Sequence, residues 1–249
     1  MAASTGVCGS GCLQRPIFAE ADEKESNIFG KWEEGGIKAD MEYKIEDFFA
    51  ALDERHTAEV RKKLWDARVG IAGIGGLGSN TATALARTGV GHIHIVDDDE
   101  VDLPNINRQA YFYRHVGRKK TDALTEIIHD INPYIEVTAD CVRVTEETIP
   151  EIFSRDKIIC EAFDKAENKA AFVNGVLASL PDAVLVSGIG MAGYSDTNLI
   201  RTRKITNHFY VCGDEKNGLE SGQKLMAPRV TACSSHQANM VIRLILGEE

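Results

Sequence analysis

The sequence predicts an α/β fold in which a mostly parallel sheet carries an antiparallel extension near the C-terminus. Three observations favour it. Short apolar segments of strand type alternate with longer helical segments from residue 68 onward, the order that produces parallel strands covered on both faces. A glycine-rich turn at 73–78 joins the first strand to its helix. The last two strand-like segments, 199–204 and 208–212, are close enough in sequence to pair antiparallel. Together these features predict a Rossmann-like, doubly wound sheet.

Each predicted element has its own local signal. The first strand, 69–72, is apolar and leads into the glycine turn, and the helix predicted at 79–88 stops at Gly89. A clear amphipathic helix at 119–132 carries Leu124, Ile128 and Ile131 on one face and ends before Pro133. The remaining strands are predicted at 92–96, 135–139, 157–162 and 183–188, and the remaining helices at 146–153, 166–180 and 230–246.

The N-terminal segment differs from the rest of the chain in composition. Residues 1–45 are rich in Gly, Ser, Ala and Glu and show no sustained apolar period, so we expect a mobile acidic tail. Order is predicted from Ile45, where apolar residues recur at helical spacing as far as Leu64. The domain organisation expected is therefore a tail at 1–45 and one catalytic domain at 46–249.

Composition and charge exclude several classes of protein. The chain has 249 residues, of which 43% are hydrophobic and 27% charged, an ordinary globular composition. The net charge is −10, and residues 20–47 alone hold ten acidic residues against four lysines. This balance disfavours nucleic acid as a partner. The sequence has no apolar run long enough for a membrane span and no secretory leader, which predicts a cytoplasmic protein.

The cysteines predict neither a disulfide framework nor a metal centre. Cysteines occur at positions 8, 12, 141, 160, 212 and 233. Only the first two lie close together, and no second pair completes a tetrahedral zinc site, so no structural zinc is expected. Cys141 and Cys160 are expected in strands as small core residues, whereas Cys212 is placed at a loop edge. His92 and His94 show no metal spacing and are expected to be surface or satisfied core residues.

The glycine turn is the first motif that indicates chemistry. Gly73, Gly75, Gly76 and Gly78 form a G-x-G-G-x-G pattern that follows a strand and opens a helix. Such glycines let backbone N–H groups approach a phosphate at the helix N-terminus. Asp97 ends the next strand, 24 residues after Gly73, where a carboxylate accepts ribose hydroxyls. This pattern alone predicts a nucleotide and leaves NAD, FAD and ATP open.

A second group of residues narrows the chemistry to nucleotidyl transfer. Asn105, Asn107 and Arg108 follow the second strand, and Lys120 opens the amphipathic helix. Cations placed in advance stabilise the charge that builds on an α-phosphate as pyrophosphate leaves. Asp164 ends a further strand, where its carboxylate can hold Mg²⁺ against phosphate oxygens.

These motifs resemble the ThiF/MoeB/HesA family, the bacterial relatives of ubiquitin-activating enzymes. The resemblance covers residues 52–247 and includes, in order, the glycine turn, the aspartate, the Asn/Arg cluster, a G-x-x-K motif and the strand-end Asp164. Within the family the chain looks most like the short ThiF type. Motifs typical of that type are EAFD at 161–164, MAGY at 191–194, CGD at 212–214 and MAPRV at 226–230.

The resemblance implies an adenylyltransferase that uses ATP and Mg²⁺. Its acceptor would be the C-terminal glycine carboxylate of a small ubiquitin-like sulfur carrier such as ThiS, activated for thiamine thiazole synthesis. A homodimer is implied, with Arg55 as a candidate that completes the partner's site. Catalysis would rest on Arg108, Lys120 and Asp164. ATP binding would involve Gly73, Gly75, Gly76, Gly78, Asp97, Asn105, Asn107, Arg108, Lys120 and Asp164.

The chain departs from the family pattern at three places, and alternatives remain. Pro104 replaces a serine, Lys165 replaces an asparagine, and residues 221–225 lack the cysteine that longer members use for a persulfide link. A covalent step is therefore not expected. One alternative keeps adenylation but takes another acceptor, as in tRNA-modifying dehydratases of this family. A second alternative is a Rossmann NAD-dependent oxidoreductase. It would account for the glycines but not for the joint presence of Arg108, Lys120 and Asp164. A non-catalytic binding module is a third alternative.

Overall fold

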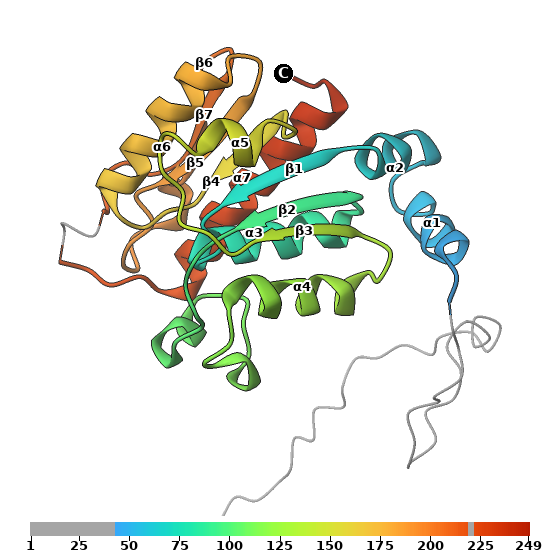
Figure 1. Ribbon diagram of the computed structural model, residues 1–249, viewed down its shortest axis with the longest axis horizontal. Coiled ribbons are helices and arrows are strands. Elements are labelled where there is room, and N and C mark those ends of the chain that lie inside the picture. Colours follow the sequence, from blue (N-terminus) through green and yellow to red (C-terminus); the bar gives the residue numbers. More distant parts are fainter. Residues whose placement is uncertain (1–42, 219–221) are drawn as a thin grey trace, which may run out of the picture. The chain divides into compact units, whose positions relative to one another are not determined.

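A seven-stranded sheet organises the part of the chain that the computed structural model describes, residues 43–218 and 222–249. The strand order is β3-β2-β1-β4-β5-β7-β6, and every neighbouring pair is parallel except β7 and β6 (Figure 1). The predicted doubly wound sheet with an antiparallel extension is thereby confirmed. The strands are β1 (Arg68–Ala72), β2 (His92–Val96), β3 (Glu136–Asp140), β4 (Ile158–Glu161), β5 (Val184–Ile189), β6 (Arg201–Thr206) and β7 (Phe209–Gly213).

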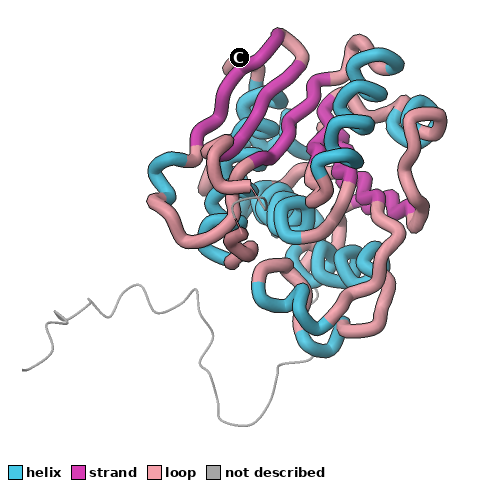
Figure 2. Tube along the Cα trace, turned by 90° about the vertical axis from the view of Figure 1, so that its left-hand side faces the viewer, coloured by secondary structure: helices cyan, strands magenta, loops and turns pink. Residues whose placement is uncertain are grey.

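Helices cover both faces of the sheet because strand residues alternate between two apolar cores. One core joins Val69 and Ile71 of β1 to α3 (Gly76–Thr88), α4 (Lys120–Ile131) and α7 (Ala227–Leu246). The other joins Ala72 to α5 (Ile149–Phe153) and α6 (Ala166–Ser179). Figure 2 shows helices in front of and behind the strands. Of the helices in the described ranges, none is long and apolar enough to span a membrane.

The helical pattern predicted at the start of the domain is interrupted in the structure. The apolar pattern from Ile45 to Leu64 forms two helices, α1 (Ile45–Asp53) and α2 (Ala58–Trp65). Thr57 separates them at φ 150°, and its hydroxyl accepts a hydrogen bond from Val60 N to begin α2. The predicted tail lies outside the described residues as far as position 42, together with Cys8 and Cys12.

Two 3₁₀ turns were also missed, η1 (Leu103–Asn107) and η2 (Tyr113–His115). They are too short to show a hydrophobic period. Both lie in the long connection between β2 and α4, the segment that carries the predicted Asn/Arg cluster.

The strand order places a crevice at the carboxyl ends of β1 and β4. Strands β2 and β3 lie on one side of β1, and β4, β5 and β7 lie on the other. The connections that leave β1 and β4 therefore run to opposite faces of the sheet, which is where α/β proteins bind ligands. Backbone hydrogen bonds from Gly73 N to Val96 O and from Ala162 N to Ala72 O join the three strand ends.

Candidate nucleotide site

The glycine turn follows β1 and forms the floor of the crevice. Gly73 adopts φ +80°, and a Cβ on Gly78 would lie 1.9 Å from Gly73 O, so neither position accepts a side chain. A Cβ on Gly75 would meet only Gln109 Nε2, at 3.7 Å. Gly75 is also the N-cap of α3 and offers no side-chain cap, and the described neighbours supply none. The first-turn amides of α3 are therefore directed at whatever anion binds there.

Asp97 is held against this turn by backbone donors. Its Oδ2 accepts from Ile74 N at 2.8 Å, and its Oδ1 accepts from Asp99 N at 2.9 Å. Residue 97 lies immediately beyond the end of β2. The structure therefore brings the predicted ribose-binding carboxylate next to the glycine turn.

Lys120 lies beside Asp97, as the first residue of α4. Its side chain is only 7% exposed, and Nζ lies 2.7 Å from Asp99 Oδ2 and 3.4 Å from Asp97 Oδ1. The buried ammonium group of Lys120 is thus paired with two carboxylates. Tyr111 donates its hydroxyl to Ile74 O at 2.8 Å. Burial, with Asp97 and Asp99 nearby, raises the pKa of Tyr111 well above its usual value, so its hydroxyl remains a donor.

Arg108 packs directly on the glycine turn. A Cβ on Gly76 would lie 3.5 Å from Arg108 Cγ. Arg108 Nη1 donates to Asn107 Oδ1 at 2.9 Å, whereas its Nε is buried without a partner among the described residues. Buried donors are normally paired. An anion at this position, such as a nucleotide phosphate, would satisfy that donor, so the residues present fit ATP.

Two α3 side chains that sequence reasoning missed hold Arg108 in place. Asn80 Nδ2 donates to Gly76 O at 2.6 Å and to Arg108 O at 2.9 Å. Ser79 Oγ donates to Gly75 O at 2.6 Å and accepts from Ala110 N at 3.0 Å. The only sequence signal was two adjacent polar residues immediately after the glycine motif. Their partners Arg108 and Ala110 lie about thirty residues further along the chain. Hydrophobic periodicity cannot predict contacts over such a distance in sequence.

The two predicted asparagines have different partners. Asn105 Oδ1 accepts from Asp102 N at 3.1 Å and so closes η1. Asn107 Nδ2 donates to Leu225 O at 3.2 Å, which ties the site to the segment before α7. Both precede Arg108 in the chain. Within the described ranges, neither side chain forms a hydrogen bond with the glycine turn.

Asp164 follows β4 at the other side of the crevice and is exposed. The N-cap of α6 is Lys165, and no side-chain cap bond is formed there within the described chain. The Asp164 carboxylate has no hydrogen bond or ion pair to any residue that the structure describes. A free carboxylate at this strand end fits Mg²⁺, which prefers one or two carboxylates together with phosphate oxygens.

Arg55 does not reach this site within the chain. It is exposed in the turn between α1 and α2. Helix α2 leads into the amino end of β1, and Gly91 N, just before β2, donates to Leu64 O. Arg55 therefore lies near the amino ends of the strands, whereas the glycine turn lies at their carboxyl ends (Figure 1).

Two expectations about cysteines were wrong. Cys212 lies inside β7 rather than at a loop edge, because the strand continues through Gly213. Burial raises its pKa to about 11. Burial also raises the pKa of Cys233 to about 12. Cys141 is exposed just after β3, not in the core, whereas Cys160 is buried as predicted.

These features define a class of protein. A glycine turn at a helix N-terminus, a carboxylate at the next strand end and two cations beside them are the site of a nucleotide-binding α/β protein. The chain belongs to the ThiF family, whose family model matches residues 50–249.

Two relatives of this chain with different names illustrate the range of the family. The tRNA threonylcarbamoyladenosine dehydratase of Bacillus subtilis is 38% identical over 135 residues, which are 53% of this chain and 52% of the relative. The sulfur carrier protein ThiS adenylyltransferase of Escherichia coli is 28% identical over 196 residues, 76% of each chain. The match thus spans about half the length of the Bacillus dehydratase and about three quarters of the adenylyltransferase.

Solved structures agree on the fold. The crystal structure of E. coli tRNA N6-threonylcarbamoyladenosine dehydratase in complex with ATP gives a TM-score of 0.72 at 23% identity, covering 80% of this chain and 94% of that one. The crystal structure of E. coli MccB with ATP gives a TM-score of 0.61 at 22% identity, covering 80% and 64%. At these identities the likeness establishes the shared architecture.

Proposed function

We propose that this protein activates a carboxylate by adenylylation with ATP. A carboxylate oxygen of the acceptor attacks the α-phosphorus, the bond to the β-phosphate bridging oxygen breaks, and an acyl-adenylate and pyrophosphate result. The observation that carries the proposal is Arg108, whose buried Nε has no hydrogen-bond partner among the described residues and lies against Gly76, at the position expected for phosphate. Little covalent work falls to the protein, which aligns the reactants and neutralises charge.

Each residue of the site has a distinct task in this proposal. The first-turn amides of α3 bind phosphate oxygens, and Asp97 accepts ribose hydroxyls. Arg108 and Lys120 meet the charge that develops as pyrophosphate leaves. Asp164 would hold Mg²⁺, which when bound neutralises phosphate charge. Asn105 and Asn107 support the loop that carries Arg108.

The relatives' names provide two acceptors with the same chemistry. Threonylcarbamoyladenosine carries the carboxylate of a threonine, and loss of water from it requires that a carboxylate oxygen become a leaving group. The C-terminal carboxylate of a sulfur carrier needs the same activation. The higher identity of the Bacillus subtilis dehydratase favours a modified tRNA nucleoside as the first acceptor to test. The longer match to the ThiS adenylyltransferase supports a ThiS-like carrier, and with it thiazole synthesis, as the second.

In either case the activated acceptor forms no covalent bond with a thiol of the enzyme. The segment 221–225 contains no cysteine. Cys212 and Cys233 are buried, and their raised pKa values keep them protonated at neutral pH. We further propose a homodimer in which Arg55 serves the site of the second copy, since it lies away from its own.

A labelling experiment tests the proposal. The full chain is incubated with α-labelled ATP and either threonylcarbamoyladenosine-containing tRNA or a ThiS-like carrier, and label on the acceptor and pyrophosphate release are measured. Labelling or release that depends on one acceptor is expected and identifies it. NADH binding without ATP binding would instead identify an oxidoreductase. ATP binding with neither acceptor modified would overturn both assignments.

A further inference from the structure

A buried ion pair lies immediately behind Asp164. Glu161, the last residue of β4, has a fully buried side chain, and Lys169 of α6 approaches it. Lys169 Nζ lies 2.5 Å from Glu161 Oε2 and 2.8 Å from Oε1. Desolvation offsets much of the attraction in such a pair, and apolar residues of the same volume often stabilise a core equally well. Stability alone therefore does not explain why an ion pair is buried at this position.

The Glu161 carboxylate closes the turn that leads to Asp164. Its Oε1 accepts from Phe163 N at 2.7 Å. The bond fixes the peptide plane one residue before Asp164. Phe163 also packs on the glycine turn, since a Cβ on Gly73 would lie 3.0 Å from Phe163 Cδ1. The same carboxylate thus holds a residue that neighbours Asp164 in the chain and lies against the glycine turn.

One further contact holds the carboxylate, and two others hold Lys169 and the Glu161 backbone. Ser187 of β5 donates its hydroxyl to Glu161 Oε2. Lys169 Nζ donates to Gly188 O at 2.7 Å. On the other side of the strand, Gln237 Nε2 donates to Glu161 O at 2.9 Å. Every oxygen of Glu161 is bonded, so the turn before Asp164 is anchored to β5, α6 and α7 at once.

We propose that Glu161, held by Lys169, is a positioning residue that aims the Asp164 carboxylate at the phosphates of bound ATP. This inference rests on the proposed function, in which Asp164 holds Mg²⁺. Loss of a residue that orients a metal ligand typically lowers the metal affinity by about 10–100-fold. Loss of the acceptor for Phe163 N should therefore weaken Mg²⁺-assisted binding while the glycine turn still binds nucleotide.

The experiment compares ATP affinity with Mg²⁺ and with EDTA by calorimetry. Glu161→Leu/Lys169→Met removes both charges and the acceptor, so no uncompensated buried charge remains. Glu161→Gln/Lys169→Met is the matched control, because the amide oxygen still accepts from Phe163 N. Mg²⁺ raises the ATP affinity of the parent, and in the first variant this increase is expected to be smaller by about 10–100-fold. The control is expected to keep it, and both should bind ATP in EDTA like the parent.

A double-mutant cycle separates positioning from folding. In an Asp164→Asn background, Glu161→Leu/Lys169→Met should cause no further loss of the Mg²⁺ gain, because both act through one carboxylate. Additive losses, or equal losses in EDTA, would overturn the inference. If the first variant does not fold, Ser187→Ala supplies the cycle with a smaller expected loss, and an unchanged Mg²⁺ gain there would likewise overturn it. Absence of ATP binding by the parent would instead overturn the proposed function.

Discussion

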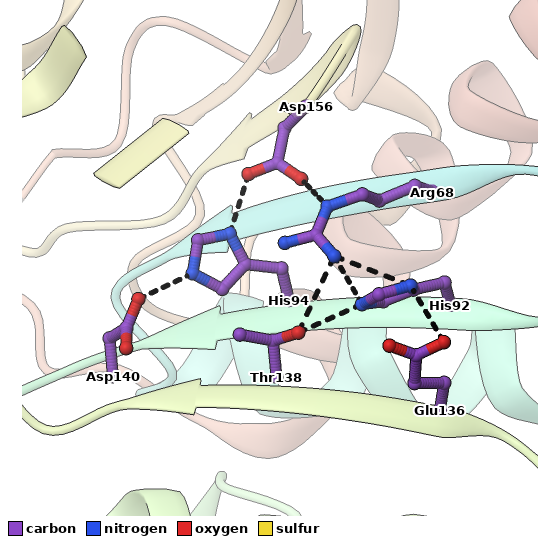
Figure 3. A network of polar contacts seen from close by, with 7 residues as sticks. All are labelled: Arg68, His92, His94, Glu136, Thr138, Asp140 and Asp156. Carbon is purple, nitrogen blue, oxygen red and sulfur yellow. Dashed lines mark hydrogen bonds and ion pairs between the residues drawn. The ribbon is translucent and has the colours of Figure 1, made fainter. Parts of the chain in front are cut away.

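His94 Nδ1, in β2, lies 2.5 Å from Asp156 Oδ2, in the connection before β4, and both side chains are buried (Figure 3). The other ring nitrogen, Nε2, lies 2.9 Å from Asp140 Oδ2. Arg68 Nε donates to the second oxygen of Asp156 at 2.6 Å. The expectation of a satisfied core histidine is confirmed for His94.

This pair predicts a large loss of stability when its carboxylate is removed. Asp156→Asn removes the buried carboxylate that pairs with Arg68 and contacts His94, and we expect the free energy of unfolding to fall by about 3–5 kcal/mol. Asp140→Asn is the control, because Asp140 is partly exposed and its ion pair should contribute about 1 kcal/mol or less. Urea unfolding measures both. Equal losses in the two variants would contradict the assignment.

Acid should remove a second electrostatic contribution. Hydrogen bonds from Arg118 and His115 lower the pKa of Glu126 to about 2 from its usual 4.5. Because the folded state keeps this carboxylate ionised, its contribution is complete above pH 4.5 and disappears as pH falls toward 2. Melting temperatures of the parent and Glu126→Gln should therefore differ near neutral pH and converge near pH 2. A constant difference across the range would exclude the ionised Glu126 as its source.

Removal of either predicted phosphate cation should slow the chemical step. Arg108→Ala and Lys120→Ala are each expected to lower kcat for acceptor-dependent pyrophosphate release by about 10²-fold or more. Arg155→Ala and Lys157→Ala are controls, since both are exposed and lie away from the crevice. An Arg108→Ala protein that folds and retains full pyrophosphate release would remove Arg108 from the catalytic set.

Asp164→Asn should leave stability unchanged. In the structure Lys165, not Asp164, occupies the N-cap of α6, and the Asp164 carboxylate contacts no described residue. A neutral amide is a poor Mg²⁺ ligand, so activity and its response to Mg²⁺ should fall sharply. Glu167→Gln, on the first turn of α6, is the control for the change in charge. A fall in melting temperature with undiminished activity per folded molecule would instead indicate that Asp164 stabilises the start of α6.

Thiol reactivity should follow burial. Among the described cysteines, Cys141 is exposed, and we expect iodoacetamide to modify it in the native protein. Cys160, Cys212 and Cys233 should react only after unfolding, because they are buried and their pKa values are raised. Peptide mass spectrometry reads out each position. Rapid native labelling of Cys212, or a reducible conjugate between enzyme and acceptor, would reveal the covalent step that we exclude.

The amino-acid sequence by itself determined the features that depend on neighbours along the chain. The alternation of strands and helices, the glycine turn and its position at a helix N-terminus follow from local periodicity and from glycine's backbone freedom. The ends of most elements agree with the structure to within a few residues. The sequence also predicted that four residues lie at one edge of the sheet, because each follows a strand and the carboxyl ends of parallel strands meet at one edge. These residues are Asp97, Arg108, Lys120 and Asp164.

Tertiary structure alone decided which of these residues touch. Asn80 reaches Arg108 across 28 positions, and His94 reaches Asp156 across 62. The burial of Cys212 depends on how far β7 extends, and that is set by its pairing with β5 and β6. The Glu161–Lys169 pair is local in sequence, yet its meaning depends on Phe163 and on the strand beside it. Strand pairing and side-chain packing join residues that are distant along the chain, and no local pattern encodes those distances.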